Sequence, residues 1–252
     1  MGRLGEVLLV TAAAGAGGTG LGGLLACMLR RDSSRLISLL LSFAAGVMTA
    51  VVCFDLLADA VLPGSGAAAG RVALAALGIL AGYGATGTLN AVIIRRDSRH
   101  GGLFLAGVIM AAAIALHNVP EGMVIGASFA RAEAAPHLGG GGWVMAAVIG
   151  LHNVPEGMAV AVPLVSGGMG KVKAALTTAA TGLPTVLGAA LGYSLGAMGP
   201  VMLAAALSFA SGAMLYVVFG ELLPEAARLW ESHLPALAAV VGIIVGMMIV
   251  YL

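Results

Sequence analysis

The chain has 252 residues, of which 60% are hydrophobic and only 9% are charged, whereas an ordinary soluble domain carries about 25% charged residues. The formal net charge is +1, and the charges lie between apolar runs instead of forming a basic face, so nucleic acid is excluded as a partner. A membrane span needs about 20 mostly apolar residues, and the chain contains several such runs. We therefore expect one polytopic transmembrane domain over residues 1–252, with the lipid bilayer as its main solvent.

Charges and turn residues divide the sequence into eight apolar segments. The first is too long for the core of a cleaved signal, and its Gly18 and Gly22 have a spacing that lets membrane helices approach closely, so we expect a retained first helix. The sixth and seventh segments come from one uncharged stretch that is too long for a single span, and Met198-Gly199-Pro200 is the expected turn. The expected spans are 5–29, 36–62, 72–94, 102–130, 142–165, 174–197, 201–222 and 235–252.

Lys and Arg are distributed unevenly over the two sides of the membrane. The loops after the first, third, fifth and seventh spans hold nine of them, and the opposite side holds three. The positive-inside rule places the first set in the cytoplasm, so both termini are expected outside. The nine are Arg30, Arg31, Arg35, Arg95, Arg96, Arg99, Lys171, Lys173 and Arg228, and the three are Arg3, Arg71 and Arg131.

Two internal repeats define the expected topology. The sequence LHNVPEGM at residues 116–123 recurs unchanged at 151–158, 35 positions later, which places the two copies on successive, oppositely directed helices. Residues 42–48 and 55–60 also align with 208–214 and 221–226, both at an offset of 166. This second repeat relates a helix that runs outward to one that runs inward, as in many secondary transporters. The fold class is therefore an all-α membrane protein of eight transmembrane helices, in which helices 1–3 and 6–8 are inverted repeats around a 4/5 pair.

Each LHNVPEGM copy places a histidine and a glutamate four residues apart, on one helix face. These pairs are His117 with Glu121 and His152 with Glu156, and Asn118 and Asn153 lie one position round. The proline between them removes a backbone donor and is expected to bend the helix. Because each histidine lies near the middle of its span, both copies are expected to meet at the bilayer midplane.

Two carboxylates at the midplane need compensation, because a charged side chain at a helix centre costs about 2.5–3.5 kcal/mol even on the lenient insertion scale. One divalent cation neutralises both, and mixed nitrogen and oxygen ligands suit zinc and its first-row neighbours. The alternative is a structural hydrogen-bonded cluster with protonated glutamates.

Acidic pairs lie at two helix ends. Asp55 and Asp59 are near the outer end of the second span, and Glu221 and Glu225 are near the inner end of the seventh. They are expected to concentrate and pass on cations, with ordinary solvated carboxylates as the alternative. Met48 precedes Asp55 by two turns, and its thioether is either a further ligand from the second span or packing filler.

The paired HNVPEG motifs, AAGVM at 44–48 and SGAMLYVVFGELLPEA at 211–226 resemble the ZIP (Zrt/Irt-like protein) metal transporters, in particular their compact bacterial members. The resemblance covers essentially the whole chain. It implies no enzymatic activity, but transport of zinc, with iron, manganese or cadmium as further substrates, through the cell (inner) membrane toward the cytoplasm. It also implies that helices one, four, five and six carry the metal against a scaffold of the others, and it leaves a homodimer open. By position, His117, Glu121, Glu156 and Met48 match one family metal site, and Asn118, Asn153, Glu121 and Glu156 match an adjoining one.

The sixth span departs from the family pattern. Many relatives have a glutamate where this chain has Thr185, in Thr181-Gly182-Leu183-Pro184-Thr185. We therefore expect one principal metal site and a weaker or absent second one.

Two other function classes remain open from the residues. An intramembrane zinc hydrolase also uses His and Glu on membrane helices, but it needs an open coordination position and normally a separate general base, and the sequence has no HExxH. A cation channel with an acidic filter is the second alternative. The symmetric duplication of the polar groups favours a transporter, because it suits access from two sides.

Overall fold

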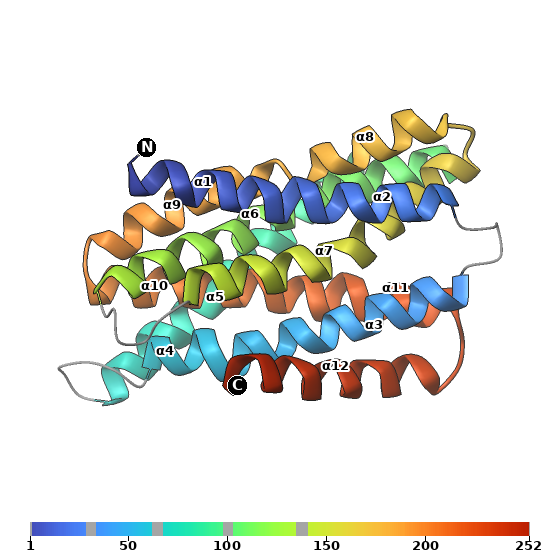
Figure 1. The fold of residues 1–252 in the computed structure, drawn as a ribbon. Coiled ribbons are helices and arrows are strands. Elements are labelled where there is room, and N and C mark those ends of the chain that lie inside the picture. Colours follow the sequence, from blue (N-terminus) through green and yellow to red (C-terminus); the bar gives the residue numbers. More distant parts are fainter. Residues whose placement is uncertain (1, 29–33, 62–67, 98–102, 135–140, 252) are drawn as a thin grey trace.

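The structure is a computed structural model that describes residues 2–28, 34–61, 68–97, 103–134 and 141–251. The side chains of His117 and Asp59 are not among those described, and neither are Arg30, Arg31 and Arg99. Within the described ranges every regular element is helical, and the helices form eight long rods, here called spans one to eight (Figure 1). Seven spans are long and apolar enough to cross a membrane, and the fourth, α6, is a helix of 32 residues.

Short π-helical segments, labelled η, interrupt three of the spans. Span one is α1 (Arg3–Ala12), η1 (Ala13–Gly17) and α2 (Gly18–Met28), and span two is α3 (Ser34–Val51), η2 (Val52–Leu56) and α4 (Leu57–Val61). Spans three, four and five are α5 (Ala68–Asp97), α6 (Leu103–Ala134) and α7 (Gly141–Ser166), and span six is α8 (Lys171–Thr181) with α9 (Pro184–Ala197). Span seven is α10 (Pro200–Val217), η4 (Val218–Leu222) and α11 (Leu223–Leu229), and span eight is α12 (Leu234–Tyr251).

The eight predicted segments are all present as helices, with ends that differ from the prediction by up to seven residues. The predicted turn between spans six and seven is also confirmed. Gly199 has a φ of 126°, which a residue with a side chain rarely adopts, and Pro200 is the first residue of α10. The glycine therefore makes the reversal possible, and the proline begins the next helix.

The inverted repeat extends over three spans on each side. Ser34 and Pro200, which begin α3 and α10, are 166 residues apart, and so are Ala68 and Leu234, which begin α5 and α12. Spans one and six correspond in the same way. Adding 166 to the residue numbers of η1 gives residues 179–183, where α8 ends and α9 begins. The offset read from two short sequence matches thus relates whole helices, including their irregular positions.

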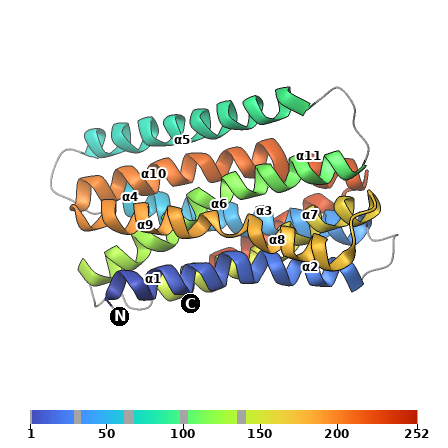
Figure 2. The ribbon, with the colours of Figure 1, turned by 90° about the horizontal axis from the view of Figure 1, so that it is seen from above.

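The spans pack in two bundles. In the first, α2 packs on α7, α6 packs on both α7 and α9, and α1 also contacts α9; in the second, α3 packs on α12 and α5 on α10. Contacts of α10 with α6 and of α3 with α7 join the two bundles. In Figure 2, α5 forms one edge of the molecule and α1 with α2 the opposite edge, with α6 between them. The grouping of spans one, four, five and six, expected from the family resemblance, is therefore present.

Glycines bring the helices of the first bundle close together. A Cβ atom on Gly22 would overlap the backbone of Val154, and one on Gly157 would overlap the backbone of Thr19. Such close backbone contact is how helices associate in lipid, where no hydrophobic force drives them together. The role predicted for Gly22 from its spacing is confirmed, and the contact holds α2 against the helix that carries the second motif.

Burial distinguishes central from peripheral spans. About two-thirds of the apolar window is buried in spans two and five, against 11% in span three and 17% in span eight. The exposed faces of α5 and α12 carry large apolar side chains such as Leu77, Leu80 and Ile244, as expected where lipid is the solvent.

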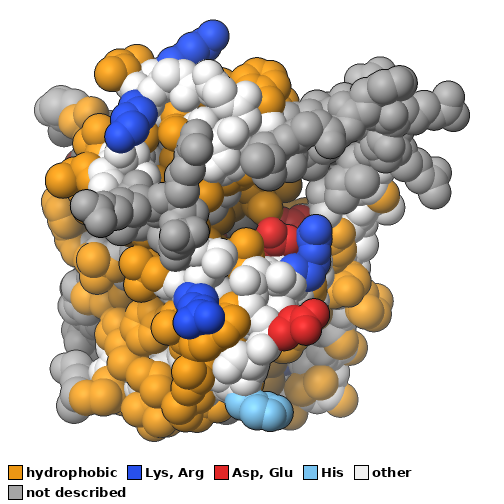
Figure 3. Space-filling model, turned by 90° about the vertical axis from the view of Figure 1, so that its right-hand side faces the viewer, with side chains coloured by type: hydrophobic (Ala, Val, Ile, Leu, Met, Phe, Trp, Pro, Cys, Tyr) orange, Lys and Arg blue, Asp and Glu red, His pale blue; other side chains and the backbone are white. Residues whose placement is uncertain are grey.

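Figure 3 views the end of the bundle at which α2 ends and α8 begins, with blue Lys and Arg side chains around it. The described cations at this end, by their places in α3, α8 and α11, are Arg35, Lys171, Lys173 and Arg228.

Candidate metal centre

The two motif copies lie on α6 and α7, which pack against each other in the first bundle. Pro120 and Pro155 lie inside helices that continue through them. The motifs bring Glu121, His152 and Glu156 together, with one ligand atom from each lying within 4.8 Å of the others. All three side chains are buried, the two glutamates completely. The predicted meeting of the two copies is therefore observed for these three residues.

The motifs interact across the helix pair. His152 Nε2 of the second copy lies 2.8 Å from Glu121 Oε1 of the first. Two buried carboxylates and a buried imidazole form a set of hard oxygen and borderline nitrogen donors, which suits a zinc-like cation. A divalent ion at this point would balance the charge of Glu121 and Glu156 together.

The Asn153 amide lies against both carboxylates and has two useful orientations. With its nitrogen toward them, it donates to Glu121 Oε2 at 3.1 Å and to Glu156 Oε2 at 3.3 Å. Turned by 180°, the nitrogen donates to Asn118 Oδ1 at 3.4 Å, and the amide oxygen faces the carboxylates. The first orientation stabilises carboxylates without a cation, and the second offers an oxygen ligand to one.

Asn118 is held by the irregular sixth span. Its Nδ2 donates to the carbonyl oxygens of Ile114 at 3.0 Å and Thr181 at 2.9 Å. Thr181 is the last residue of α8, so its carbonyl group is released by the end of that helix. Hydropathy predicted one continuous span here. The break has a local sequence signal in Gly182 and in Pro184, which is the first residue of α9.

Thr185, where the resemblance led us to expect a departure from a glutamate, is completely buried. Its hydroxyl donates to the carbonyl oxygen of Gly182. A Cβ atom on Gly15 would overlap this hydroxyl, so the Thr185 side chain packs against span one. The side chain therefore adds no carboxylate to the cluster and instead fills the contact between spans one and six.

Two other predicted ligands are placed less fully. Met48 is buried on α3, and α3 contacts α7, which carries the second motif. Its role as a ligand stays a prediction. The backbone of His117 belongs to α6, but its side chain lies outside the described residues.

The predicted outer acidic pair gives one unexpected contact. Asp55 is in η2, and its Oδ1 lies 3.3 Å from Nη1 of Arg131 in the last turn of α6. The sequence predicts Arg131 only as a positive charge on the outer side. The pair joins residues 76 positions apart, and no local pattern of charges predicts it.

The predicted inner acidic pair lies beside a small cavity. Glu221 and Glu225 line a space of about 20 Å³, enough for about one water molecule, together with residues of α3, α6 and α7. On the other side of it, Ile114 is one turn before Asn118, and Ala159 is about one turn after Glu156. The cavity thus lies between the metal centre and the inner carboxylates. The remaining lining residues are Leu41, Met110 and Leu222.

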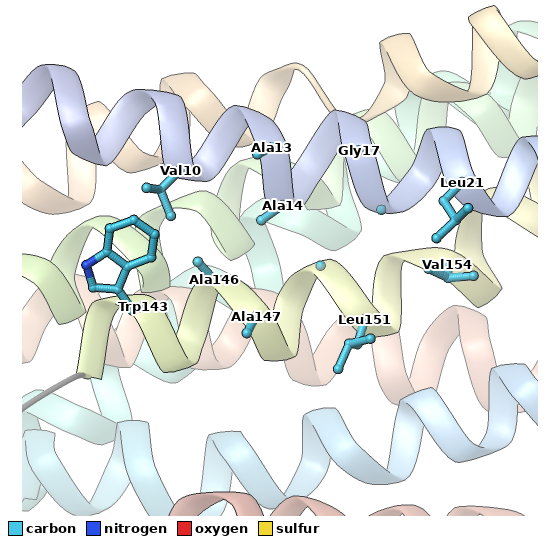
Figure 4. Close-up of a pocket in the computed structure, with 12 residues that line it drawn as sticks. Val10, Ala13, Ala14, Gly17, Leu21, Trp143, Ala146, Ala147, Leu151 and Val154 are labelled. Atoms are coloured by element: carbon cyan, nitrogen blue, oxygen red, sulfur yellow. The ribbon is translucent and has the colours of Figure 1, made fainter.

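A larger groove of about 530 Å³ runs between span one and α7 (Figure 4). Its walls are almost entirely apolar, so it offers an ion no ligands and is distinct from the metal centre. The residues around it are Val10, Ala13, Ala14, Gly17, Gly18, Leu21, Trp143, Ala146, Ala147, Gly150, Leu151 and Val154.

Comparisons with known proteins agree with the motifs. Residues 94–252 match the family described as ZIP Zinc transporter. The chain is 34% identical over 257 residues to the zinc transporter ZupT of Chlorobium limicola, covering 91% of this chain and 90% of that protein. It is 33% identical over 274 residues to ZupT of Chlorobium phaeovibrioides, covering 100% and 98%, and 30% identical over 267 residues to ZupT of Akkermansia muciniphila, covering 96% and 94%.

Proposed function

The chain belongs to the ZIP zinc transporter family and is a multi-pass membrane protein, and on this premise we propose that it carries zinc across the membrane through the Glu121–His152–Glu156 centre. The observation that carries the proposal is the complete burial of two glutamates, one from each motif copy, beside the same histidine. Such a cluster is costly in a membrane unless a cation or protons compensate it.

Zinc is the substrate that these donors favour. Its preferred ligands are imidazole nitrogen, carboxylate oxygen and thiolate, and the centre supplies the first two. The Asn153 amide oxygen and Met48 are proposed as additional ligands. Iron, manganese and cadmium are proposed as competing substrates, because the same donor set accepts several divalent ions and availability decides among them.

We assign a direction and an orientation to this transport. Arg35, Lys171, Lys173 and Arg228 share one end of the bundle, which supports placing that end in the cytoplasm and both termini outside, in the cell membrane. Zinc then enters past Asp55 and Asp59, binds at the centre, and leaves past the small cavity toward Glu221 and Glu225. Fixed carboxylates at each end raise the local concentration of cations.

The centre supports a transporter over the two alternatives. A channel needs a continuous polar path, whereas the Asp55–Arg131 ion pair lies across the outer side and the cavity on the inner side measures only about 20 Å³. A hydrolase needs access for its substrate to an activated water and a general base. The family to which the chain belongs consists of transporters, and the buried centre lies between acidic residues of both ends.

Zinc uptake into liposomes tests the proposal. The purified protein is reconstituted with a zinc-sensitive dye trapped inside, and uptake is compared for the parent protein, Glu121→Ala and Glu156→Ala. Glu133→Ala is the matched control, because Glu133 is also on α6 but is exposed and paired with Arg3. We expect both centre variants to abolish uptake and the control to retain it. Uptake in both centre variants, or hydrolysis of membrane peptides without uptake, would contradict the proposal.

A further inference from the structure

Arg131 ties the two bundles together at the end that we assign to the outside. Its Nη1 lies 3.3 Å from Oδ1 of Asp55, with 20% of the Arg131 and 14% of the Asp55 side chain exposed. Arg131 is on α6, which carries the first motif of the metal centre, and Asp55 is on η2 of the other bundle. The ion pair therefore spans the interface that an ion must pass on its way to the centre.

The contact leaves half of the carboxylate available. Asp55 Oδ2 is buried and has no hydrogen-bond partner within the described part of the structure. A structural Arg–Asp pair commonly uses both oxygens in two parallel hydrogen bonds. Here a single, rather long contact holds one oxygen, and a cation that reaches the mouth still has the other oxygen to bind.

The inner end is built differently, although it derives from the same repeat. Glu221 is the counterpart of Asp55 at the offset of 166, and it lines the small cavity beside the centre. The nearby Glu225 accepts a hydrogen bond from Arg228 at 2.9 Å, three residues further along α11. That pair lies within one helix, whereas the Asp55–Arg131 pair joins two bundles.

We propose that Arg131 is a positioning residue that occupies Asp55 in the absence of metal, and that an arriving divalent cation must displace its guanidinium to enter. Arg131 and the metal then compete for one carboxylate. A divalent ion displaces a single positive charge more readily than a monovalent ion does, because its attraction to the carboxylate is twice as large at the same distance. The pair thus closes the outer mouth and selects for divalent ions. This inference rests on the proposed transport function.

The competition is tested with a double-mutant cycle on zinc uptake in liposomes, using Arg131→Gln, Asp55→Asn and both together. Arg131→Gln should lower the half-saturating zinc concentration by about 3- to 10-fold, the range expected for the net effect of one ordinary hydrogen bond, with a smaller effect on the maximal rate. Asp55→Asn should raise the half-saturating concentration, because it removes the capturing group. The double variant should have a half-saturating concentration close to that of Asp55→Asn, because the proposed effect of Arg131 on capture requires that carboxylate.

Two further variants keep the test decisive. Arg3→Gln is the matched control, because it also removes one positive charge from the outer end. Arg3 forms ion pairs with Glu6 and Glu133, and both lie within the first bundle. It should leave the half-saturating concentration unchanged. If Arg131→Gln does not fold, Arg131→Lys keeps the charge without the planar guanidinium and should give a smaller decrease.

The inference is overturned if Arg131→Gln lowers only the maximal rate, or if its effect adds to that of Asp55→Asn instead of disappearing. Either result means that Arg131 has a structural role alone. The proposed function is checked separately in the same assay, since it requires only that Glu156→Ala abolish the uptake of the parent protein.

Discussion

Asp55 and Glu221 occupy the same fourth position of two five-residue π-helical segments, η2 and η4, which lie 166 residues apart in the chain. Their spans run in opposite directions, so the same local structure places one carboxylate toward each end of the bundle. A π-helical turn inserts an extra residue into a helix and is frequent at functional sites. The inverted repeat has therefore kept an irregular, acidic turn in both copies.

This symmetry predicts that two substitutions raise the half-saturating zinc concentration from opposite sides of the membrane. Asp55→Asn should raise the half-saturating zinc concentration for uptake from the outer side, because it removes attraction and not the central site. Glu221→Gln should do the same for zinc offered from the inner side. Both are measured on liposomes in which one orientation of the protein has been inactivated. Equal effects from both sides would rule out separate roles at the two mouths.

A second prediction concerns stoichiometry and pH. Glu121 and Glu156 are balanced by one divalent ion, and Thr185 adds no carboxylate, so a second ion would leave two uncompensated positive charges in the membrane interior. Calorimetry on the purified protein should give one tightly bound zinc ion. Metal ligands must be deprotonated, so zinc binding should release protons and weaken as the pH falls. Two tight ions, or an affinity independent of pH over the acidic range, would contradict this.

A third prediction tests the packing that supports the centre. Gly22→Leu places a side chain where α2 meets the backbone of Val154, two residues before Glu156. Overpacking of this kind costs about 1–3 kcal/mol, so the variant should lose thermal stability and transport together. Gly17→Leu is the matched control, because a Cβ atom there meets nothing within 4 Å. Equal loss in both variants would show that general damage to span one, and not the contact with α7, is responsible.

Much of the fold could be predicted from the sequence. Apolar runs, their separating charges and the Gly199-Pro200 turn determine the eight spans, since a helix that crosses lipid needs a minimum apolar length. The offset of 166 also predicted which helices correspond. The π-helical segments and the break after Thr181 were missed. The break had a local signal in Gly182 and Pro184, but the π-helical segments had none, because an apolar helix that is buried in protein shows almost no periodicity from which a shift of one residue could be recognised.

The candidate site was predictable in part. The duplicated motif indicated that Glu121, His152 and Glu156 meet, because each copy puts its polar groups on one face at the middle of its span. The contact of His152 with Glu121 and the pairing of Asp55 with Arg131 depend on how α6 packs against α7 and the second span. Nothing local to these residues specifies those contacts, so only the three-dimensional structure reveals them.

Zinc-edge anomalous diffraction from crystals grown with zinc tests directly whether Glu121, His152 and Glu156 bind zinc, because it locates the ion without reference to activity. We expect one dominant anomalous peak between the Glu121 and Glu156 carboxylates and His152 Nε2, with metal-to-ligand distances of about 2.0–2.2 Å. In Glu156→Ala crystals this peak should be lost. A parent structure with zinc bound only at Asp55, Glu221 or elsewhere on the surface, and none between α6 and α7, would contradict it.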